Sequence, residues 1–186
     1  MRRLVSPAGF LLALLCFGFP FLTVSCDLPD GSVRLHASGV NLVADTAPTV
    51  EGAGRQSDDA GIASSDAVSW DDMSAVGRTL VRASAALTVV ALGLSLVRRN
   101  RIWPVAAGVA AALAGVTLVA GTITIRRWLI DAVVAQDGGS FYSRDDVAAA
   151  VHLRYGIAAT VAWLVVGIAG LAADVIRPHR LPSHAA

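Results

Sequence analysis

Four long apolar runs constrain this chain more than any other feature of its sequence. The hydrocarbon layer of a bilayer is about 30 Å thick, and a helix needs about 20 residues to cross it. Lipid cannot hydrogen-bond the backbone, so apolar runs of this length should be helical. The sequence therefore predicts an all-α membrane protein with four transmembrane helices in a bundle. The predicted spans cover approximately residues 5–24, 79–97, 102–125 and 155–173.

The composition agrees with a chain that lies in lipid. Of the 186 residues, 55% are hydrophobic and 16% are charged, which leaves few charges to cover an ordinary soluble domain. All fifteen basic residues are arginine, a bias typical of high-G+C bacterial genomes. The net charge of +1 and the scattered arginines give no reason to expect nucleic acid as a partner. The first predicted partner is the lipid bilayer itself.

The positions of the arginines predict an orientation. Residues 98–101 alone join the second and third spans, so these spans form an antiparallel hairpin. Arginines in short loops favour the cytoplasmic side. Both termini are therefore predicted to be cytoplasmic in a bacterial plasma membrane. The arginines on that side are Arg2, Arg3, Arg98, Arg99, Arg101, Arg177 and Arg180. Arg126 and Arg127, which follow the third span, argue against this orientation, although Asp131 soon offsets them.

The two outer loops, approximately residues 25–78 and 126–154, are predicted to form a small, partly ordered extracytoplasmic cap. Alternating residues around Ser38-Gly39, within 33–44, predict a short β-hairpin. Segment 51–66 is acidic and small, with little to bury, and is predicted to be mobile.

Helix signals also occur in these loops. Residues 128–134 predict a short apolar helix at the membrane surface. Ser69 and Ser143 are each followed three residues later by an acid, a pattern that starts helices. The second and fourth spans are therefore predicted to extend as helices beyond the outer membrane surface.

Few residues qualify as sites. Arg82 is the only charged residue clearly within a predicted span, and it can snorkel to the headgroups or form a functional ion pair. Asp145 and His152 are seven residues apart and would share a helical face. They can be read as a solvated face, a metal site or an acid–base pair. Because no further cluster accompanies them, no catalytic residue, cofactor or metal is predicted.

The two cysteines raise separate questions. Cys16 and Cys26 lie ten residues apart on one predicted helix, about 15 Å, which is too far for a disulfide. Thr23-Val-Ser-Cys26 after an apolar run resembles a bacterial lipoprotein signal, in which Cys26 would become the lipidated N-terminus. Such signals prefer an aliphatic residue where Thr23 stands, and Pro20 interrupts the apolar run. The alternative is a cysteine at the outer end of an uncleaved span.

Small and aromatic residues of the third span predict packing and anchoring. Gly108 with Ala112, and Ala111 with Gly115, have the four-residue spacing that permits close helix contact. Trp103 and Trp128 bracket the span as interface anchors.

The overall plan resembles a class of uncharacterised small four-span proteins of high-G+C bacteria. The likeness rests on Pro20-Phe-Leu-Thr-Val-Ser-Cys26 and Ser38-Gly-Val-Asn-Leu42, and it implies no known activity. The loop layout is also similar to that of claudin-like tetraspan proteins. The Trp and paired-Cys signature of that family is missing, so its function is not carried over.

These observations favour a non-enzymatic accessory protein that contacts another envelope membrane protein, or a copy of itself, through its cap or helix faces. A small transport or channel component acting as an oligomer is the alternative. A quinone-linked thiol enzyme is disfavoured, because it would need paired reactive cysteines.

Overall fold

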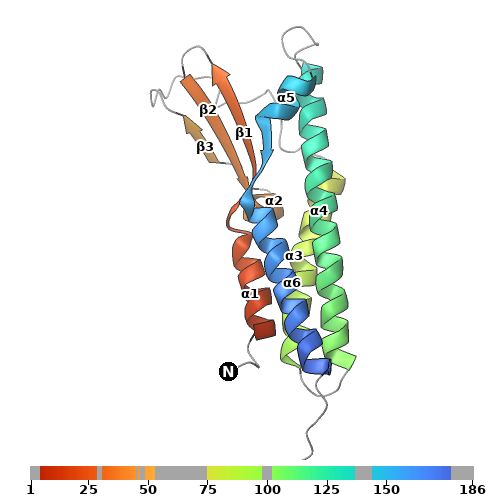
Figure 1. The fold of residues 1–186 in the computed structure, drawn as a ribbon. Helices are drawn as coiled ribbons and strands as arrows, with labels where there is room; N and C mark the ends of the chain where they lie inside the picture. The colour runs from red at the N-terminus through yellow and green to blue at the C-terminus, as the bar shows by residue number, and fades with distance from the viewer. Residues whose placement is uncertain are drawn as a thin grey trace, which may run out of the picture.

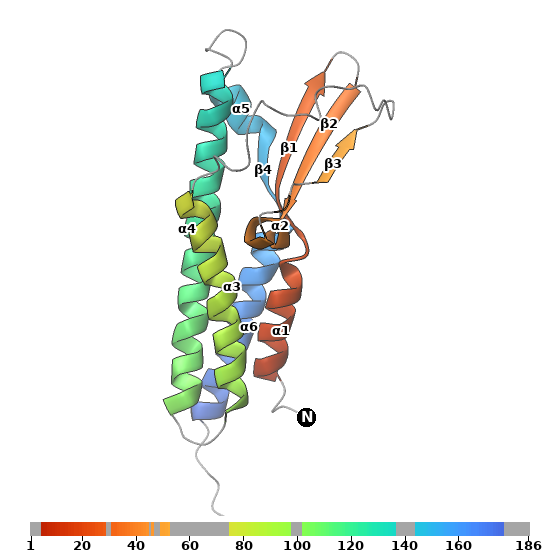
Figure 2. The same ribbon diagram turned by 180° about the vertical axis from the view of Figure 1, so that it is seen from behind.

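The structure is a computed structural model with a helical stem that carries a small sheet at one end (Figures 1 and 2). It describes residues 5–28, 31–44, 46, 49–52, 75–97, 102–136 and 144–176. We use "stem" for the helices α1 (Val5–Cys16), α3 (Ala75–Leu96), α4 (Ile102–Gln136) and α6 (Tyr155–Ile176). We use "cap" for β1 (Pro20–Leu28), β2 (Gly31–Ser38), α2 (Gly39–Ala44), β3 (Thr49–Gly52), α5 (Arg144–Ala150) and β4 (Val151–Leu153).

Three stem segments are long and apolar enough to cross a membrane, judged by length and composition. They are Ala75–Leu96, Ile102–Ala132 and Tyr155–Ala173. These segments overlap the second, third and fourth predicted spans, although the segment from Ile102 continues to Ala132, beyond the predicted end at residue 125. They make the chain compatible with a multi-pass membrane protein.

The stem helices bury small side chains and expose large ones. The buried stripe of α3 consists of Gly77, Val81, Ser84, Thr88, Ala91 and Ser95. The exposed large residues of α4 include Val105, Val109, Leu113, Val116, Val119 and Ile123. A surface helix of a soluble protein turns its large apolar residues inward. The reverse arrangement, with small residues at the helix contacts, is typical of helices packed within lipid.

The first apolar run does not form one helix, contrary to the prediction for residues 5–24. Helix α1 ends at Cys16, and β1 begins at Pro20. Twelve residues of helix are about 18 Å long, less than the hydrocarbon layer. A bundle of four full-length spans is therefore not confirmed.

Local chemistry explains why α1 stops. Proline disfavours helical backbone at the residue before it, here Phe19. The amides of Phe17 and Gly18 donate to carbonyls only three residues back, at 3.1 and 3.0 Å, which is how a helix end tightens. The Phe21-Leu-Thr-Val24 sequence that follows is rich in aromatic and β-branched residues and favours a strand.

The four strands form one antiparallel sheet in the order β3-β2-β1-β4. A hairpin exists, but it joins β1 to β2, whereas the prediction placed it within residues 33–44. The second half of that segment is helix α2, because Ser38 caps it: the amide of Asn41 donates to Ser38 Oγ at 3.2 Å.

Two other helix predictions are corrected. Residues 128–134 are the last part of α4, which continues unbroken because no glycine or proline follows Gly121 before Gln136. The fourth span does not extend outward as one helix, since β4 separates α5 from α6. The start signals at Ser69 and Ser143, and residues 53–66 of the acidic segment, lie outside the described residues.

The cap is continuous with two helices of the stem. Helix α1 packs along α6 and leads into β1, while β4 pairs with β1 and leads into α6. The helix pair therefore continues as a strand pair (Figure 2). Close backbone approach makes this possible. A Cβ on Gly9 would lie 2.9 Å from the amide nitrogen of Gly167, and a Cβ on Gly156 would lie 2.7 Å from the Pro20 carbonyl oxygen.

Buried side chains form three clusters along the molecule. The stem cluster is mainly alanine, with Phe10 and Leu164. A second cluster at the base of the cap includes Phe17, Phe21, Leu22, Leu42 and Ile125. A third, formed by Ile130, Val147 and Val151, ties the outer part of α4 to α5 and β4.

Candidate functional site at the junction of cap and stem

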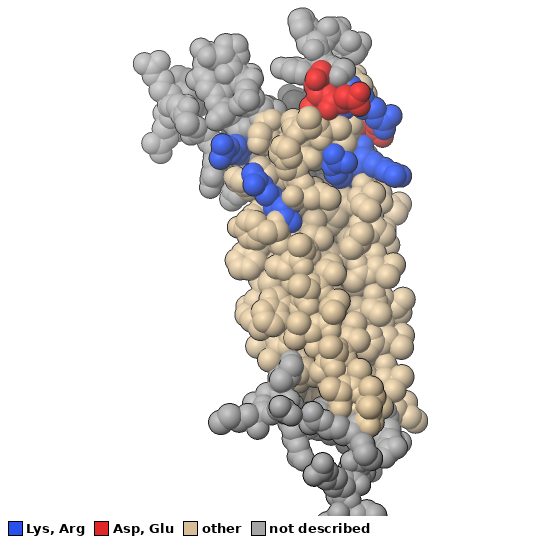
Figure 3. Space-filling view, viewed as in Figure 1, with Lys and Arg blue, Asp and Glu red and all other residues tan. Residues whose placement is uncertain are grey.

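All seven described arginines lie in the cap, in the cap-proximal parts of α3 and α4, or, for Arg154, between β4 and α6. They are Arg34, Arg78, Arg82, Arg126, Arg127, Arg144 and Arg154. On the face drawn in Figure 3, the described charged side chains gather at this end, and the described stem surface below them is uncharged. The junction is therefore where the described part of the chain concentrates its polar chemistry.

Arg82 holds the end of a cap helix. Its Nε donates to the carbonyl oxygen of Val43 at 3.0 Å. Val43 is the penultimate residue of α2, and the last carbonyls of a helix have no partner within that helix. A cation at this position satisfies such a carbonyl and interacts favourably with the helix dipole. Neither reading of Arg82 from the sequence included this contact.

Arg126 does the same for the second cap helix. Its Nη2 donates to the Ala148 carbonyl oxygen at 3.0 Å, and its Nε lies 3.4 Å from the Val151 carbonyl oxygen. Ala148 is in the last turn of α5, and Val151 begins β4. The guanidinium therefore fixes the point where α5 gives way to β4. Its neighbour Arg127 is exposed, and the described residues include no partner for it.

The third arginine reaches into the sheet. Arg154 Nε donates to Thr23 Oγ1 at 3.1 Å, and Thr23 Oγ1 lies 3.0 Å from His36 Nδ1. Thr23 is fully buried, and the Arg154 amide donates to the Phe21 carbonyl oxygen at 3.0 Å. With its oxygen accepting from Arg154, the Thr23 hydroxyl is free to donate to Nδ1 of a histidine protonated on Nε2.

The strand register gives the sheet two unlike faces. Thr23 lies opposite both His36 and His152, so these three residues share one face. The adjacent rows, Leu22 with Ala37 and Val24 with Val151, belong to the other face and pack into the second and third clusters. One face is therefore polar, and the other anchors the sheet to the stem.

The pair Asp145 and His152 is not on a common helix. Asp145 lies in α5 and His152 in β4, and both are exposed. Among the described residues, no group of three or more His, Cys, Asp or Glu could hold a metal ion. Nearby, Arg144 and Asp131 form an ion pair at 2.7 Å between α5 and α4. Both side chains are largely exposed, so the pair adds little stability.

The cysteines fall on different elements. Cys16 is buried in α1, and Cys26 lies in β1 opposite Val33, so the predicted helical separation does not apply. The Cys26 side chain is outside the description. Its lipidation stays a prediction, with a structural consequence. Cleavage before Cys26 would remove α1 and much of β1, including the buried Phe10 and Thr23.

Only some of the residues predicted to allow close helix packing lie at a helix contact. Ala111 is buried and a Cβ on Gly115 would meet Leu164, whereas Ala112 is exposed and a Cβ on Gly108 would meet nothing within 4 Å. Trp103 is exposed near the start of α4, and Trp128 packs half-buried against the second cluster.

The close contacts that the structure does use involve Gly9 with Gly167 and Gly77 with Gly121. Sequence reasoning missed them because each pair joins different helices.

Comparisons with known proteins gave no match: no family model, curated protein or solved structure is significantly similar to this chain.

Proposed function

We propose that this chain is a non-enzymatic, multi-pass protein of a bacterial plasma membrane whose cap docks another envelope membrane protein. The observation that carries the proposal is the construction of the junction. Two stem helices continue into the sheet, and Arg82, Arg126 and Arg154 fasten the cap elements by hydrogen bonds. A cap held in one orientation presents a pre-organised surface, which lowers the entropic cost of binding a partner.

The polar face of the sheet is the surface we assign to the partner. Arg34 and His152 are exposed on the cap. His36 is half-buried, two residues after Arg34 on β2 and in the same cross-strand row as Thr23 and His152. The opposite face is occupied by the second and third clusters and is not available. A polar face of this kind suits a partner that presents hydrogen-bonding groups of its own.

A site-specific photo-crosslinker tests this role. We would place it at Arg34, on the cap, and at Val109, on the exposed surface of α4, as the matched control. The proposal predicts that irradiated native membranes yield a discrete protein adduct from position 34 and none from position 109. Absence of any protein adduct at position 34, and equally at positions 149 and 152, would rule the docking role out.

The orientation proposed from the sequence, with both termini cytoplasmic, has support in the fold. The described chain begins at the end of the stem where α6 and α3 finish and α4 begins (Figure 1). Arg126, which counted against this orientation, is engaged by the carbonyls of α5 and β4. With Cys16 and Cys26 replaced, an Ala149→Cys variant should react with a membrane-impermeant maleimide in intact cells. Protection of that cysteine until the cells are lysed would reverse the orientation.

The alternative role, an oligomeric transport component, stays a prediction. Alanines fill the centre of the stem, where Ala107, Ala111 and Ala114 are fully buried, and Ser84 Oγ donates to the Ala114 carbonyl oxygen at 2.8 Å. With a stem packed in this way, a conducting path would have to form between copies of the chain.

A further inference from the structure

The described aromatic residues at the base of the sheet mark a boundary between apolar stem and polar cap. The rings of Phe19 and Tyr155 are 5.9 Å apart, and the two residues are 47% and 62% exposed. Tyr155 begins α6, whose following residues are apolar, and Arg154 directly precedes it. Tyrosine, with an apolar ring and a polar hydroxyl, collects at membrane–water interfaces, and the Phe19 ring lies beside that of Tyr155. If the stem lies in a bilayer, as proposed above, this boundary is at headgroup depth.

Arg154 is held at that boundary, and among the described residues only Nε of its guanidinium has a hydrogen-bond partner. Its Nε is committed to the fully buried Thr23 hydroxyl, whose oxygen is also within hydrogen-bond distance of His36. Among the described residues, none accepts a hydrogen bond from its two terminal nitrogens. Because the guanidinium group is planar, fixing Nε also restricts the direction of the two terminal nitrogens. Two parallel N–H groups in that geometry match a phosphate or carboxylate group.

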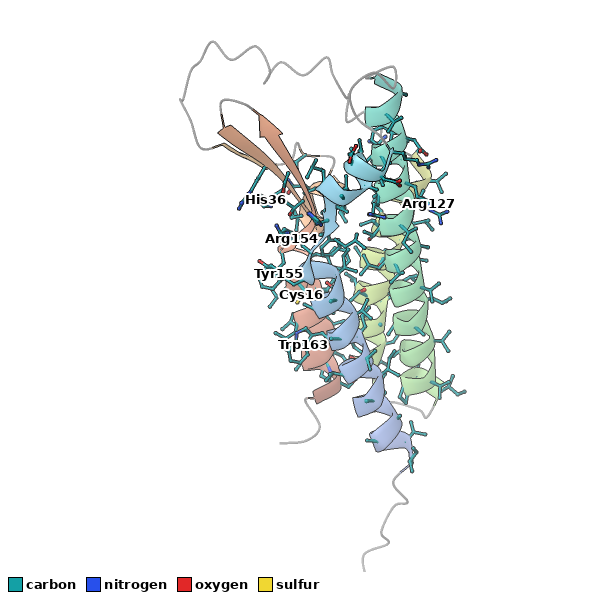
Figure 4. The ribbon with its side chains drawn as sticks, turned by 45° about the horizontal axis from the view of Figure 1, so that its top comes forward. Cys16, His36, Arg127, Arg154, Tyr155 and Trp163 are labelled. Atoms are coloured by element: carbon teal, nitrogen blue, oxygen red, sulfur yellow. The ribbon has the colours of Figure 1, made fainter. Side chains whose placement is uncertain are left out.

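The position of the residue selects between anions. Figure 4 places Arg154 directly above Tyr155 and below His36, on the side of the molecule that carries the sheet and α1. A ligand on the terminal nitrogens would therefore have apolar stem and aromatic rings beneath it and polar cap above. This combination suits a molecule with a charged phosphate and attached acyl chains.

We propose that Arg154 binds the phosphate of an anionic phospholipid in the leaflet on the cap side, with the rings of Phe19 and Tyr155 against its glycerol and upper acyl chains. Thr23 acts as a positioning residue that aims the guanidinium. The inference rests on membrane insertion, but not on the identity of any protein partner. If Arg154 binds a phospholipid in this way, the cap contacts the membrane at a defined point beside the sheet.

The test uses the full chain reconstituted in nanodiscs of phosphatidylcholine with increasing phosphatidylglycerol, and counts retained lipid by native mass spectrometry. Wild-type protein should retain phosphatidylglycerol preferentially, and Arg154→Gln should weaken retention about tenfold, as expected for loss of a charge-assisted pair. Arg127→Gln is the matched control, because Arg127 is exposed on α4, on the opposite side of the molecule from Arg154 (Figure 4). It should behave like wild type.

A second variant guards against misfolding and tests the geometry. Thr23→Val keeps the positive charge but removes the acceptor that aims it, so it should also lower retention. Equal losses in Arg154→Gln and Arg127→Gln would mean general charge attraction and would overturn the proposal. So would a site that takes inorganic phosphate in pure phosphatidylcholine discs but does not retain phosphatidylglycerol. Release of the wild-type chain from native membranes by alkaline carbonate would instead refute the proposed membrane insertion itself.

Discussion

At the scale of single residues, three arginines link cap and stem by binding backbone or hydroxyl oxygens. Arg82 and Arg126 each satisfy carbonyls at the end of a short helix, and Arg154 binds a buried hydroxyl. Short helices such as α2 and α5 are marginal alone, because nucleation is costly and few internal hydrogen bonds repay it. Their stability therefore depends on contacts supplied by the stem.

Arg126→Met tests this dependence. Loss of the charged donor leaves the Ala148 and Val151 carbonyls without their guanidinium partner, which should weaken the cap by about 1–3 kcal/mol. Amide hydrogen exchange in residues 144–153 should accelerate, while exchange in α6 stays slow. Arg127→Met, the adjacent exposed position, should leave the exchange pattern unchanged. Equal acceleration in both variants would contradict the capping role.

The sequence placed Arg82 and Arg126 near the predicted membrane boundary and gave no signal for Arg154, and it could not predict the partners of any of the three. From the sequence, Arg126 is only a charge that opposes the predicted orientation. Its contacts are with residues 22 and 25 positions later in the chain. These contacts are predictable only when the residue at which α5 ends is known. The sequence predicted one uninterrupted helix in this region, so it gave no indication of that end.

At the scale of elements, α3, α4 and α6 were predictable because their length and composition leave the backbone one solution in lipid. The structure of the first apolar run, residues 5–24, was not predictable in this way, although the run is equally apolar. Gly18 and Pro20 stop α1, and the β-forming residues after Pro20 pair with β2 and β4. Apolar content alone could not separate a helix followed by a strand from one long helix. The proline was the available signal.

Close contact between α1 and α6 gives a sharp test of this element pair. In Gly9→Ala, the new methyl group would lie 2.9 Å from the Gly167 nitrogen and 3.2 Å from the Trp163 carbonyl oxygen. Both are backbone atoms, so the helices must separate, at a cost of about 1–3 kcal/mol. The melting temperature in detergent should fall by several degrees.

The control for this change is Gly108→Ala, since a Cβ on Gly108 meets nothing within 4 Å. Its melting temperature should stay the same or rise slightly, because alanine favours helix over glycine. If the two variants melt alike, α1 and α6 do not pack as described.

At the scale of the whole molecule, the stem has its large apolar side chains outside and its small ones inside. The exposed face of α4 is apolar from Ile102 to Ile123, about 32 Å of helix, and then carries Arg127 and Asp131. That length matches the hydrocarbon thickness of about 30 Å. The remaining residues of α4 rise past this level and support α5, which explains why the helix is longer than a membrane requires.

Depth profiling along this face of α4 tests membrane insertion most directly. Nitroxide labels would be placed singly at Val109, Val116, Ile123, Arg127 and Asp131 in a reconstituted chain lacking its two native cysteines. Electron paramagnetic resonance then compares collisions with oxygen, which concentrates in lipid, and with a water-soluble nickel chelate. We predict oxygen-dominated relaxation at the first three positions and nickel-dominated relaxation at Arg127 and Asp131. Nickel access at Val109 and Val116 equal to that at Asp131 would contradict a stem that lies in the membrane.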